Sequence, residues 1–563
     1  MKRYFVLLTL TPLAMLIVAE LTAWMLWTGH PLTSFWYVPW TTLEYWSWQW
    51  SFHNYVFTRF LDWIATKQGQ WPRSVDIYQW FQDSGNWHFW FKIYRGFLFS
   101  AVATGILWVG TIAAFAWFCW RLRIRIGGTR VPPQAENQQT LQAGASQSGK
   151  TSLELQTLAD IRKRGDPVIV TDPSGEITKH FCGQGGRRDY ILDIGDARSI
   201  NWSPFAELAA GVNADLLAQK MIGEGKGPEK DWRGYASGIL RDVMLSLVKL
   251  GTCTNADLCR AILADNRTIK ELVKGRPSEI HFASGNEKYL ASVRSILSTY
   301  TAPLFGLDPE AGSHSFSIAR HIQGLQHADG RGKYIWRWLF LKTRGGDLSD
   351  SQKQMLSCWM SIAVNSALSL PVNRKRRIWF VMEEAGNLGT ITGFASIVTQ
   401  GAKYGVCVIA LIQSVSQFED LYGKERAQTI LSCFNNVVVC RLADPQTAEY
   451  FERHFGKKEV IEWRRSEGSQ GGHSSSGRSE QIRVRPKFYS HELMELRGKC
   501  ITWIVGGHPR RRSVPKPNLP IVSEAFVPRP ERHQQPPSPP ATLVPDVEEP
   551  RTVAVPNGPQ WKE

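Results

Sequence analysis

Residues 144–151 read Gly144-Ala-Ser-Gln-Ser-Gly-Lys-Thr151, which matches the GxxxxGK[ST] pattern of a phosphate-binding loop. In such a loop the glycines let the backbone turn its N–H groups inward around phosphates. Lys150 can then reach the β- and γ-phosphates of a nucleotide, and the Thr151 hydroxyl can bind Mg²⁺. The pattern alone is only moderately specific, so the flanking sequence decides how it is interpreted.

The sequence on both sides of this loop has the order strand, loop, helix, strand. Residues 140–143 are a candidate strand before the loop, and residues 167–171 form an apolar strand that is closed by Asp172. Between them, helical spacing produces an apolar stripe made by Leu153, Leu155, Leu158 and Ile161. A βαβ unit of about thirty residues is the context that this loop requires, so the sequence predicts an α/β P-loop fold.

A second acidic element lies far downstream, in the stretch RRIWFVMEEAGNLG at residues 376–389. Residues 378–382 are an apolar strand that ends in Glu383 and Glu384. In P-loop enzymes the acidic residue at such a strand end holds Mg²⁺, and a following glutamate can orient the attacking water. The metal-side residue is usually Asp, whereas Glu383 is one methylene longer. The alternative interpretation is an ordinary strand end that happens to be acidic.

Two further strands extend the predicted site. Residues 406–412 end in Gln413, and residues 437–440 end in Arg441. A polar side chain at the position of Gln413 can sense the γ-phosphate or position water, and it can also be a plain strand end.

Together, these stretches supply the candidate residues for one nucleotide site. The predicted catalytic residues are Lys150, Glu384 and Gln413. The predicted Mg²⁺ ligands are Thr151 and Glu383. The expected nucleotide-binding residues are Gly144, Ala145, Ser146, Gln147, Ser148, Gly149, Lys150, Thr151 and Ser152.

The distance between the two halves of this site predicts an insertion. About 230 residues separate Lys150 from Glu384, far more than one βαβ unit needs. Because residues 205–300 carry helical apolar spacing, we expect an all-helical domain at 205–324. The nucleotide-binding domain is then expected in two parts, 126–204 and 325–514, with residues 334–342 re-entering the sheet.

Two downstream segments lack the composition of a folded core. Residues 464–482 are rich in Gly, Ser, Arg and Glu, and we expect a long mobile loop there. From Pro515 the chain is dominated by Pro with few aromatic residues, so residues 515–563 are expected to form a disordered tail.

The N-terminal part, residues 1–125, is predicted to be a two-helix membrane module. Residues 4–28 and 97–120 are each long and apolar enough to cross about 30 Å of hydrocarbon. The basic residues that flank them predict that both ends are cytoplasmic and that the loop 30–96 lies outside. That loop is rich in Trp, which suits either a contact at the membrane interface or the core of a small domain.

Composition leaves the class of partner open. The 563-residue chain has a net charge of +16, from 66 Lys and Arg against 50 Asp and Glu. This excess fits nucleic acid or anionic lipid, but a membrane protein with basic cytoplasmic flanks would show part of it without either. The nine cysteines form no CxxC pair, which disfavours a zinc site or a disulfide framework.

Taken together, these motifs resemble the type IV coupling proteins of secretion and conjugation, a family of membrane ATPases. The resemblance includes GASQSGKT, VIVTDPSGE at 168–176, INWSPF at 200–205, RRIWFVMEEAGNLG, and LIQSVSQFEDLYG at 411–423. It implies a RecA-like motor domain with an inserted all-α domain, working with ATP and Mg²⁺ as a homo-hexameric ring. It also implies a place in the bacterial inner membrane, with single-stranded DNA, its relaxosome and the type IV secretion channel as partners.

The sequence departs from the family pattern at two places. The family's metal-side Asp is Glu383 here, and its frequent Gly-Arg-Lys is Gly401-Ala402-Lys403. Because an arginine supplied by a neighbouring subunit can be worth about 10³–10⁵ in rate, its absence leaves Lys403 or Arg441 as replacements, or means slow hydrolysis. Three functions therefore remain: an ATP-driven coupling protein, a nucleotide-binding substrate receptor with little ATPase activity, or a pump for double-stranded DNA.

Overall fold

The computed structural model describes residues 109–113 and 123–529, apart from 187, 226, 228, 284, 328–336, 343–348, 387–389 and 471–472. The predicted loop 30–96 and the tail beyond 529 lie outside this range, as do the predicted membrane helices except for residues 109–113. Among the described residues, no helix has both the length and the apolar character needed to cross a membrane. The chain divides into Met1–Leu122 and Arg123–Glu563, and the strands and helices from β1 onward lie in the second unit.

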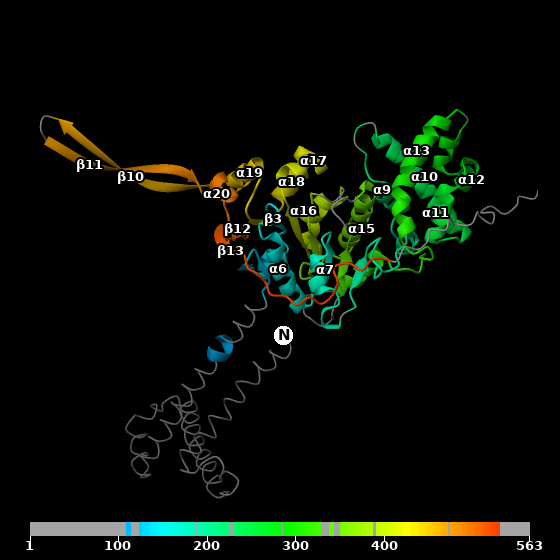
Figure 1. Ribbon diagram of the computed structural model, residues 1–563, viewed down its shortest axis with the longest axis horizontal. Coiled ribbons are helices and arrows are strands. Elements are labelled where there is room, and N and C mark those ends of the chain that lie inside the picture. The colour runs from blue at the N-terminus through cyan, green and yellow to red at the C-terminus, as the bar shows by residue number, and fades with distance from the viewer. Residues whose placement is uncertain are drawn as a thin grey trace, which may run out of the picture. The chain divides into compact units, whose positions relative to one another are not determined.

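A mixed nine-stranded sheet forms the centre of this unit (Figure 1). Its seven parallel strands are β3 (Thr140–Ala143), β4 (Val168–Thr171), β5 (Tyr190–Leu192), β6 (Leu339–Leu341), β7 (Ile378–Met382), β8 (Val406–Ile412) and β9 (Asn436–Val439). Two antiparallel strands, β12 (Lys499–Trp503) and β13 (Arg510–Ser513), complete one edge. The order across the sheet is β13-β12-β9-β3-β8-β7-β4-β6-β5. The carboxyl ends of the parallel strands therefore meet along a single edge.

Helices cover both faces of the sheet, because alternate strand residues point to opposite sides. On one face, Val168 and Val170 of β4 pack with Leu158 of α6 and Phe181 of α7. On the other face, Ile169 shares a core with α15, α16, α17, α18 and α19. The bounds of these helices are α6 Lys150–Arg164, α7 Glu176–Phe181, α15 Asp350–Leu368, α16 Phe394–Tyr404, α17 Val415–Tyr422, α18 Lys424–Ser432 and α19 Pro445–Phe455. Shorter elements at the periphery are β1 Arg125–Ile126, β2 Thr129–Arg130, α5 Pro133–Glu136, η2 Gln184–Gly186 and α20 Ser490–Met494.

A helical insert lies between β5 and β6, as the sequence predicted for this part of the chain. Its longest helix, α10 (Glu229–Leu250), packs against α9 (Ala214–Ile222), α11 (Asn255–Leu263) and α13 (Glu287–Thr301). Because α15 packs on α9 and α13 as well as on α16, the insert and the sheet share one core. The remaining elements are α8 Pro204–Ala209, α12 Asn266–Leu272, η3 Pro277–Phe282, η4 Ala302–Gly306, α14 Ile318–Gly324 and η5 Leu325–His327.

Glu207 joins the beginning of this insert to its end. Its buried carboxylate accepts hydrogen bonds from Trp202 Nε1 at 2.8 Å and from Ser317 Oγ at 2.8 Å. It also accepts the backbone N–H groups of Ile318 and Ala319, at 2.6 and 3.1 Å, in the first turn of α14. A side chain of α8 thus caps a helix more than a hundred residues later, which returns the chain to the sheet at β6.

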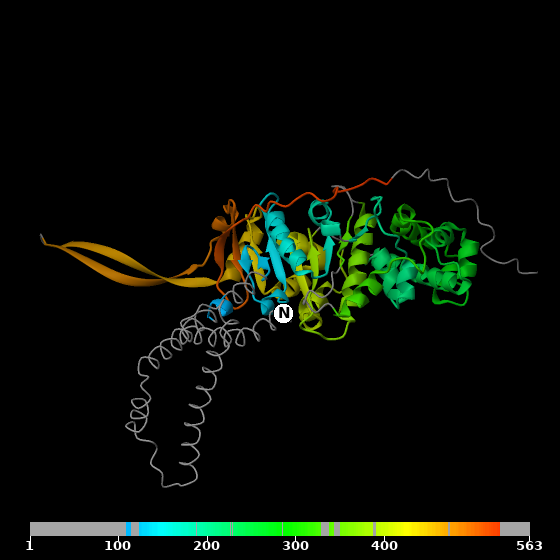
Figure 2. The same cartoon turned by 90° about the horizontal axis from the view of Figure 1, so that it is seen from below.

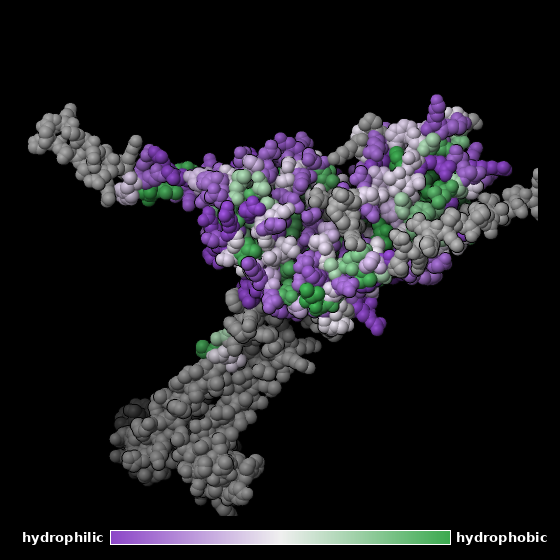
Figure 3. Space-filling view, viewed as in Figure 1, coloured by the Kyte–Doolittle hydropathy of each residue, from purple (hydrophilic) through white to green (hydrophobic). Residues whose placement is uncertain are grey.

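The segment 464–482 differs from the mobile loop that its composition suggested. It belongs to an antiparallel hairpin, in which β10 (Lys457–Gln470) pairs with β11 (His473–Pro486) along their whole length. At its base, Ile461 lies opposite Ile482, and both side chains are more than half exposed. Apolar side chains are visible on the hairpin's surface in Figure 3. Gly and Ser lower strand propensity, but they do not prevent main-chain pairing between two segments of equal length.

Residues 514–529, which we call the C-terminal strap, also differ from expectation. The sequence placed residues from Pro515 onward in a disordered tail, yet residues 515–529 are extended and bonded to the body of the unit. The N–H of Val522 donates to Lys179 O at 2.9 Å, and the N–H of Arg529 donates to Gly195 O at 2.9 Å. Figures 1 and 2 show the strap passing α6 and α7. A Pro-rich segment cannot build its own core, but here its partners come from the rest of the unit.

Glu207→Ala is expected to lower the free energy of unfolding by about 3 kcal/mol or more, since four buried donors lose a charged acceptor. Urea denaturation of the purified chain measures this loss. Glu310→Ala is the matched control, because Glu310 is exposed and its removal should change stability by less than about 0.5 kcal/mol. Equal losses for the two variants would contradict the proposed closure of the insert by Glu207.

Candidate nucleotide site

The phosphate-binding loop lies over the carboxyl ends of three neighbouring strands. After β3, the N–H of Gly144 donates to Ile412 O of β8 at 3.2 Å, and the N–H of Ala145 donates to Arg441 O at 2.8 Å. A Cβ at Gly144 would lie 2.6 Å from Ser148 Oγ, so no side chain fits there. Gly149 has a φ of +95°, which a residue with a side chain rarely adopts, and it leads directly into α6.

Lys150 is the first residue of α6, and its ammonium group lies inside the loop. It donates to the backbone carbonyls of Gly144 and, at 3.2 Å, of Ala145. Burial lowers the pKa of Lys150, and the neighbouring carboxylates oppose this shift. The first N–H groups of α6 have no carbonyl one turn earlier to accept them, so the loop presents a cation and helix-end donors together. An anion such as a phosphate group fits this cradle.

Two carboxylates lie side by side at the ends of adjacent strands. Since Thr171 of β4 pairs with Met382 of β7, the next residues, Asp172 and Glu383, are neighbours. Ser174 Oγ donates to both, at 3.3 Å to Asp172 and 3.2 Å to Glu383. Burial, and then the charge of Asp172, raises the pKa of Glu383 to about 8.

A third carboxylate, Glu154, was missed by sequence analysis. It lies on α6 one turn after Lys150, is 1% exposed, and neither of its oxygens has a hydrogen-bond partner among the described residues. Burial and the charges of Glu383 and Asp172 raise its pKa well above the usual value. The sequence does hint at this position, because a glutamate four residues after Lys150 lies on the same face of the helix. A single Glu in an apolar stripe does not, however, show that other carboxylates lie next to it.

Glu384 and Gln413 form a direct pair. Gln413 Nε2 donates to Glu384 Oε1 at 3.2 Å. Because β8 lies between β3 and β7, Gln413 is placed between the loop and the carboxylates. Glu384 has a φ of +54°, a conformation that costs a non-glycine residue roughly 1–3 kcal/mol at strained functional sites. The structure thus brings together the three predicted catalytic side chains.

Lys150, Glu383, Glu384 and Gln413 all line one cavity of about 550 Å³. All of the predicted site residues line it except Gly144, which lies at the start of the loop. Ser174 and Glu176 line it too, although sequence analysis assigned them no role. The full lining is Ala145, Ser146, Gln147, Ser148, Gly149, Lys150, Thr151, Ser152, Ser174, Glu176, Glu383, Glu384, Leu411, Ile412 and Gln413.

The two basic residues considered as replacements for the missing arginine occupy different places. Arg441 follows β9, and its Nη2 donates to Ser146 O of the same chain's loop at 3.4 Å. Lys403 is exposed in the last turn of α16, next to the start of β8, and so lies at the sheet edge opposite the loop. Of these two residues, it is Arg441 that contacts the phosphate-binding loop of its own chain.

The donor set fits a nucleotide-bound Mg²⁺. No group of three or more His, Cys, Asp or Glu side chains in the described part of the chain is arranged to hold a metal ion by itself. A Mg²⁺ in such a site needs only one or two protein ligands, because phosphates and water supply the rest. Thr151 and Glu383 line the same cavity. Glu383 also lies next to Asp172, and a cation bound there would relieve the repulsion between the two carboxylates.

Comparison with known proteins identifies the family. Residues 123–512 match the type IV secretion-system coupling protein DNA-binding domain, so the chain belongs to this family. It is 26% identical over 340 residues to the coupling protein TraD of Escherichia coli K12, covering 60% of this chain and 46% of TraD. It is 28% identical over 394 residues to the conjugal transfer protein TraG of Rhizobium radiobacter, covering 63% of this chain and 58% of TraG. The chain thus spans about half the length of these relatives.

Solved structures of the conjugative coupling protein TrwB share the fold. The unbound TrwB fragment has a TM-score of 0.63 and 27% identity, covering 72% of this chain and 91% of TrwB. TrwB in complex with ADP and Mg²⁺ has a TM-score of 0.61 and 26% identity, covering 72% of this chain and 92% of TrwB. The predicted RecA-like P-loop domain with an all-α insert is confirmed. Most of the predicted membrane module lies outside the described residues.

The positive φ of Glu384 predicts a stability difference between two substitutions. Glu384→Gly relieves the backbone strain and Glu384→Gln keeps it, so we expect the Gly variant to be more stable by about 1 kcal/mol. Urea denaturation of both variants measures the difference. At Glu425, in the ordinary helix α18, the same pair should show the opposite sign. A less stable Gly variant at 384 would show that this backbone is not strained.

Proposed function

We propose that this chain is an ATP-driven coupling protein of the bacterial inner membrane, which moves single-stranded DNA with its relaxase toward a type IV secretion channel. The observation that supports it most is the convergence of Lys150, Glu384 and Gln413 on one cavity at the ends of β3, β7 and β8. Family membership and the likeness to TrwB support the class of cargo. TrwB has been solved with ADP and Mg²⁺ and with a non-hydrolysable ATP analogue, which supports ATP as the nucleotide.

The residues of the cavity suit hydrolysis of the terminal phosphate. Lys150 and the loop N–H groups would bind the phosphates, and Thr151 and Glu383 would hold Mg²⁺, which supplies charge neutralisation. Glu384 would orient a water molecule and accept its proton. Gln413 would keep the Glu384 carboxylate turned into the cavity, as its 3.2 Å hydrogen bond indicates. The bond from Ser174 to Glu383 would offset the extra methylene by limiting the rotamers of Glu383.

The mode of assembly also belongs to this proposal. A homo-hexamer would bring a cation from one subunit to the nucleotide of the next, and the exposed Lys403 is available for such a contact. Arg441 instead contacts its own loop, so it would act within one subunit. Residues 4–28 and 97–120 would anchor each subunit in the membrane.

Turnover of ATP by the purified full chain, with and without single-stranded DNA, tests the motor. We expect DNA to stimulate hydrolysis. Glu384→Gln should lower the turnover number about 10²–10⁴-fold while nucleotide still binds, because only the proton acceptor is lost. Lys150→Ala should lose both binding and turnover. Fluorescent-nucleotide titration separates the two effects.

Three other outcomes would each reject part of this proposal. Wild-type turnover equal to that of Lys150→Ala would leave a nucleotide-binding substrate receptor. Stronger stimulation by duplex than by single strands would favour a double-stranded DNA pump. Normal plasmid transfer from donor cells that carry only the Lys150→Ala chain would show that transfer does not need this site.

A further inference from the structure

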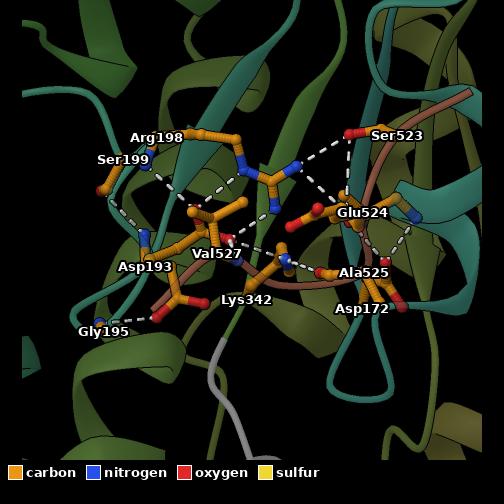
Figure 4. Close-up of polar contacts among 12 residues, drawn as sticks. Asp172, Asp193, Gly195, Arg198, Ser199, Lys342, Ser523, Glu524, Ala525 and Val527 are labelled. Atoms are coloured by element: carbon orange, nitrogen blue, oxygen red, sulfur yellow. Dashed lines mark hydrogen bonds and ion pairs between the residues drawn. The ribbon is translucent and has the colours of Figure 1, made fainter. Parts of the chain in front are cut away.

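A buried ion pair outside the nucleotide cavity holds the backbone of the C-terminal strap. Lys342 follows β6 and is 3% exposed, and its Nζ lies 3.2 Å from Asp196 Oδ2, whose side chain is fully buried. The same ammonium donates to Ala525 O of the strap (Figure 4). Burying a charged pair is costly, so the pair is stable only when its remaining hydrogen bonds are satisfied. Here the strap supplies one of those bonds.

Arg198 extends this contact along the strap. Its guanidinium donates to Asp196 Oδ1 and Oδ2 at 2.9 and 2.7 Å. Nη1 also reaches Ser523 Oγ at 2.7 Å and Glu524 O at 3.0 Å. Asp196 is therefore paired with two cations, and both of these cations donate to main-chain carbonyls of the strap.

The strap also pairs with the body as a short antiparallel strand would. The N–H of Ala197 donates to Val527 O at 2.8 Å, the N–H of Arg529 donates to Gly195 O at 2.9 Å, and Asp196 forms a bridge with Pro528. Pairing of an extended peptide with an exposed main chain is a common mode of peptide recognition, in which backbone bonds give affinity and side-chain pockets give specificity.

Phe526 supplies the side-chain specificity. The position of a Cβ at Gly195 would lie 3.4 Å from Phe526 Cζ, so a glycine there lets the ring approach the backbone closely. Lys342 Nζ lies 5.9 Å from the centre of the ring, within reach of a cation–π interaction. Residues 193–198 and Lys342 thus form a groove suited to an extended peptide with an aromatic residue.

The strap contacts two glycines, Gly149 and Gly175, in segments that line the nucleotide cavity. Val514, at its beginning, fills the space where a Cβ of Gly149 in the phosphate-binding loop would lie, with Cγ1 only 2.6 Å from that position. Ala525 O lies 2.9 Å from the corresponding position at Gly175, which has a φ of +74°. Gly175 connects Ser174 and Glu176, and both of these residues line the cavity. Docking of the strap therefore restricts two of the segments that shape the nucleotide site.

We propose that the groove formed by residues 193–198 and Lys342 is a peptide-binding site, that the chain's own residues 522–529 occupy it, and that this occupancy strengthens nucleotide binding. The second part rests on the proposed nucleotide binding. In the sequence, 34 residues, 530–563, follow Arg529. A partner that pulled on this tail would withdraw the strap and loosen the phosphate-binding loop. Since coupling between sites is reciprocal, a bound nucleotide would also hold the strap more firmly.

Hydrogen exchange of residues 514–529 in the full chain tests the groove itself. Phe526→Ala and Lys342→Met should each speed exchange across the strap by about tenfold or more, because each removes a contact that holds it. Ile521→Ala is the control, since that strap side chain is 67% exposed. A synthetic peptide of residues 519–530 should restore slow exchange at residues 193–198 of the Phe526→Ala variant, whose groove is intact, but not of Lys342→Met. Variants that exchange no faster than the control would overturn the peptide site.

Titration with a fluorescent, non-hydrolysable ATP analogue tests the coupling. Phe526→Ala should weaken its binding about fivefold or more, and the analogue should slow exchange of the wild-type strap by a similar factor. A chain ending at Arg529 should bind like the wild type. Unchanged affinity in Phe526→Ala would overturn the coupling but not the groove. If the wild type does not bind the analogue while Phe526→Ala still frees the strap, the proposed function fails and the peptide site stands.

Discussion

The parallel pairing of β3, β8, β7 and β4 is the constraint on which the rest of the site depends. Each strand ends at the same edge, so residues that are hundreds of positions apart become neighbours. The central position of β8 separates the phosphate-binding loop from the acidic strand by one strand width, about 4.8 Å on each side. This spacing leaves room for a phosphate group between Lys150 and the carboxylates, and it places Gln413 between them. With a different strand order, the same motifs would be present in the sequence, but their side chains would not meet in one site.

The electrostatics of the cavity follow from that arrangement. Three carboxylates, Glu154, Asp172 and Glu383, are buried close to one another, and burial together with mutual repulsion raises the pKa of Glu154 and Glu383. Such an excess of buried acid is unfavourable unless cations approach it. A P-loop enzyme that binds its nucleotide with Mg²⁺ brings both the anion that Lys150 needs and the cation that the carboxylates need. The site is therefore better satisfied when occupied, and this favours tight binding.

Sequence was sufficient for the parts of the fold that local pattern determines. The GxxxxGK[ST] loop, the apolar strands and the acid pair at 383–384 each carry their own signal, and the structure brings them together as predicted. It was not sufficient where tertiary contacts decide. Glu154 looked like one polar residue in an apolar stripe, and its carboxylate neighbours come from strands that lie far away in the chain. The composition of residues 464–482 predicts a mobile loop, because Gly and Ser lower strand propensity, but pairing between β10 and β11 outweighs this effect.

The strap shows why amino-acid composition alone gives a wrong prediction for a segment that is ordered by packing on the rest of the unit. Residues 515–529 contain four prolines and cannot form a core, so an argument from composition alone predicts disorder. Their order comes instead from contacts with the body: the Lys342 ammonium and the Arg198 guanidinium donate to carbonyls of the strap, and both cations pair with the buried Asp196 carboxylate. This contact also links the strap to the nucleotide site. Removing the strap would take carbonyl acceptors away from Lys342 and Arg198. It would also remove Val514 from Gly149 and Ala525 from Gly175. The proposed coupling between the strap and the nucleotide cavity rests on these contacts.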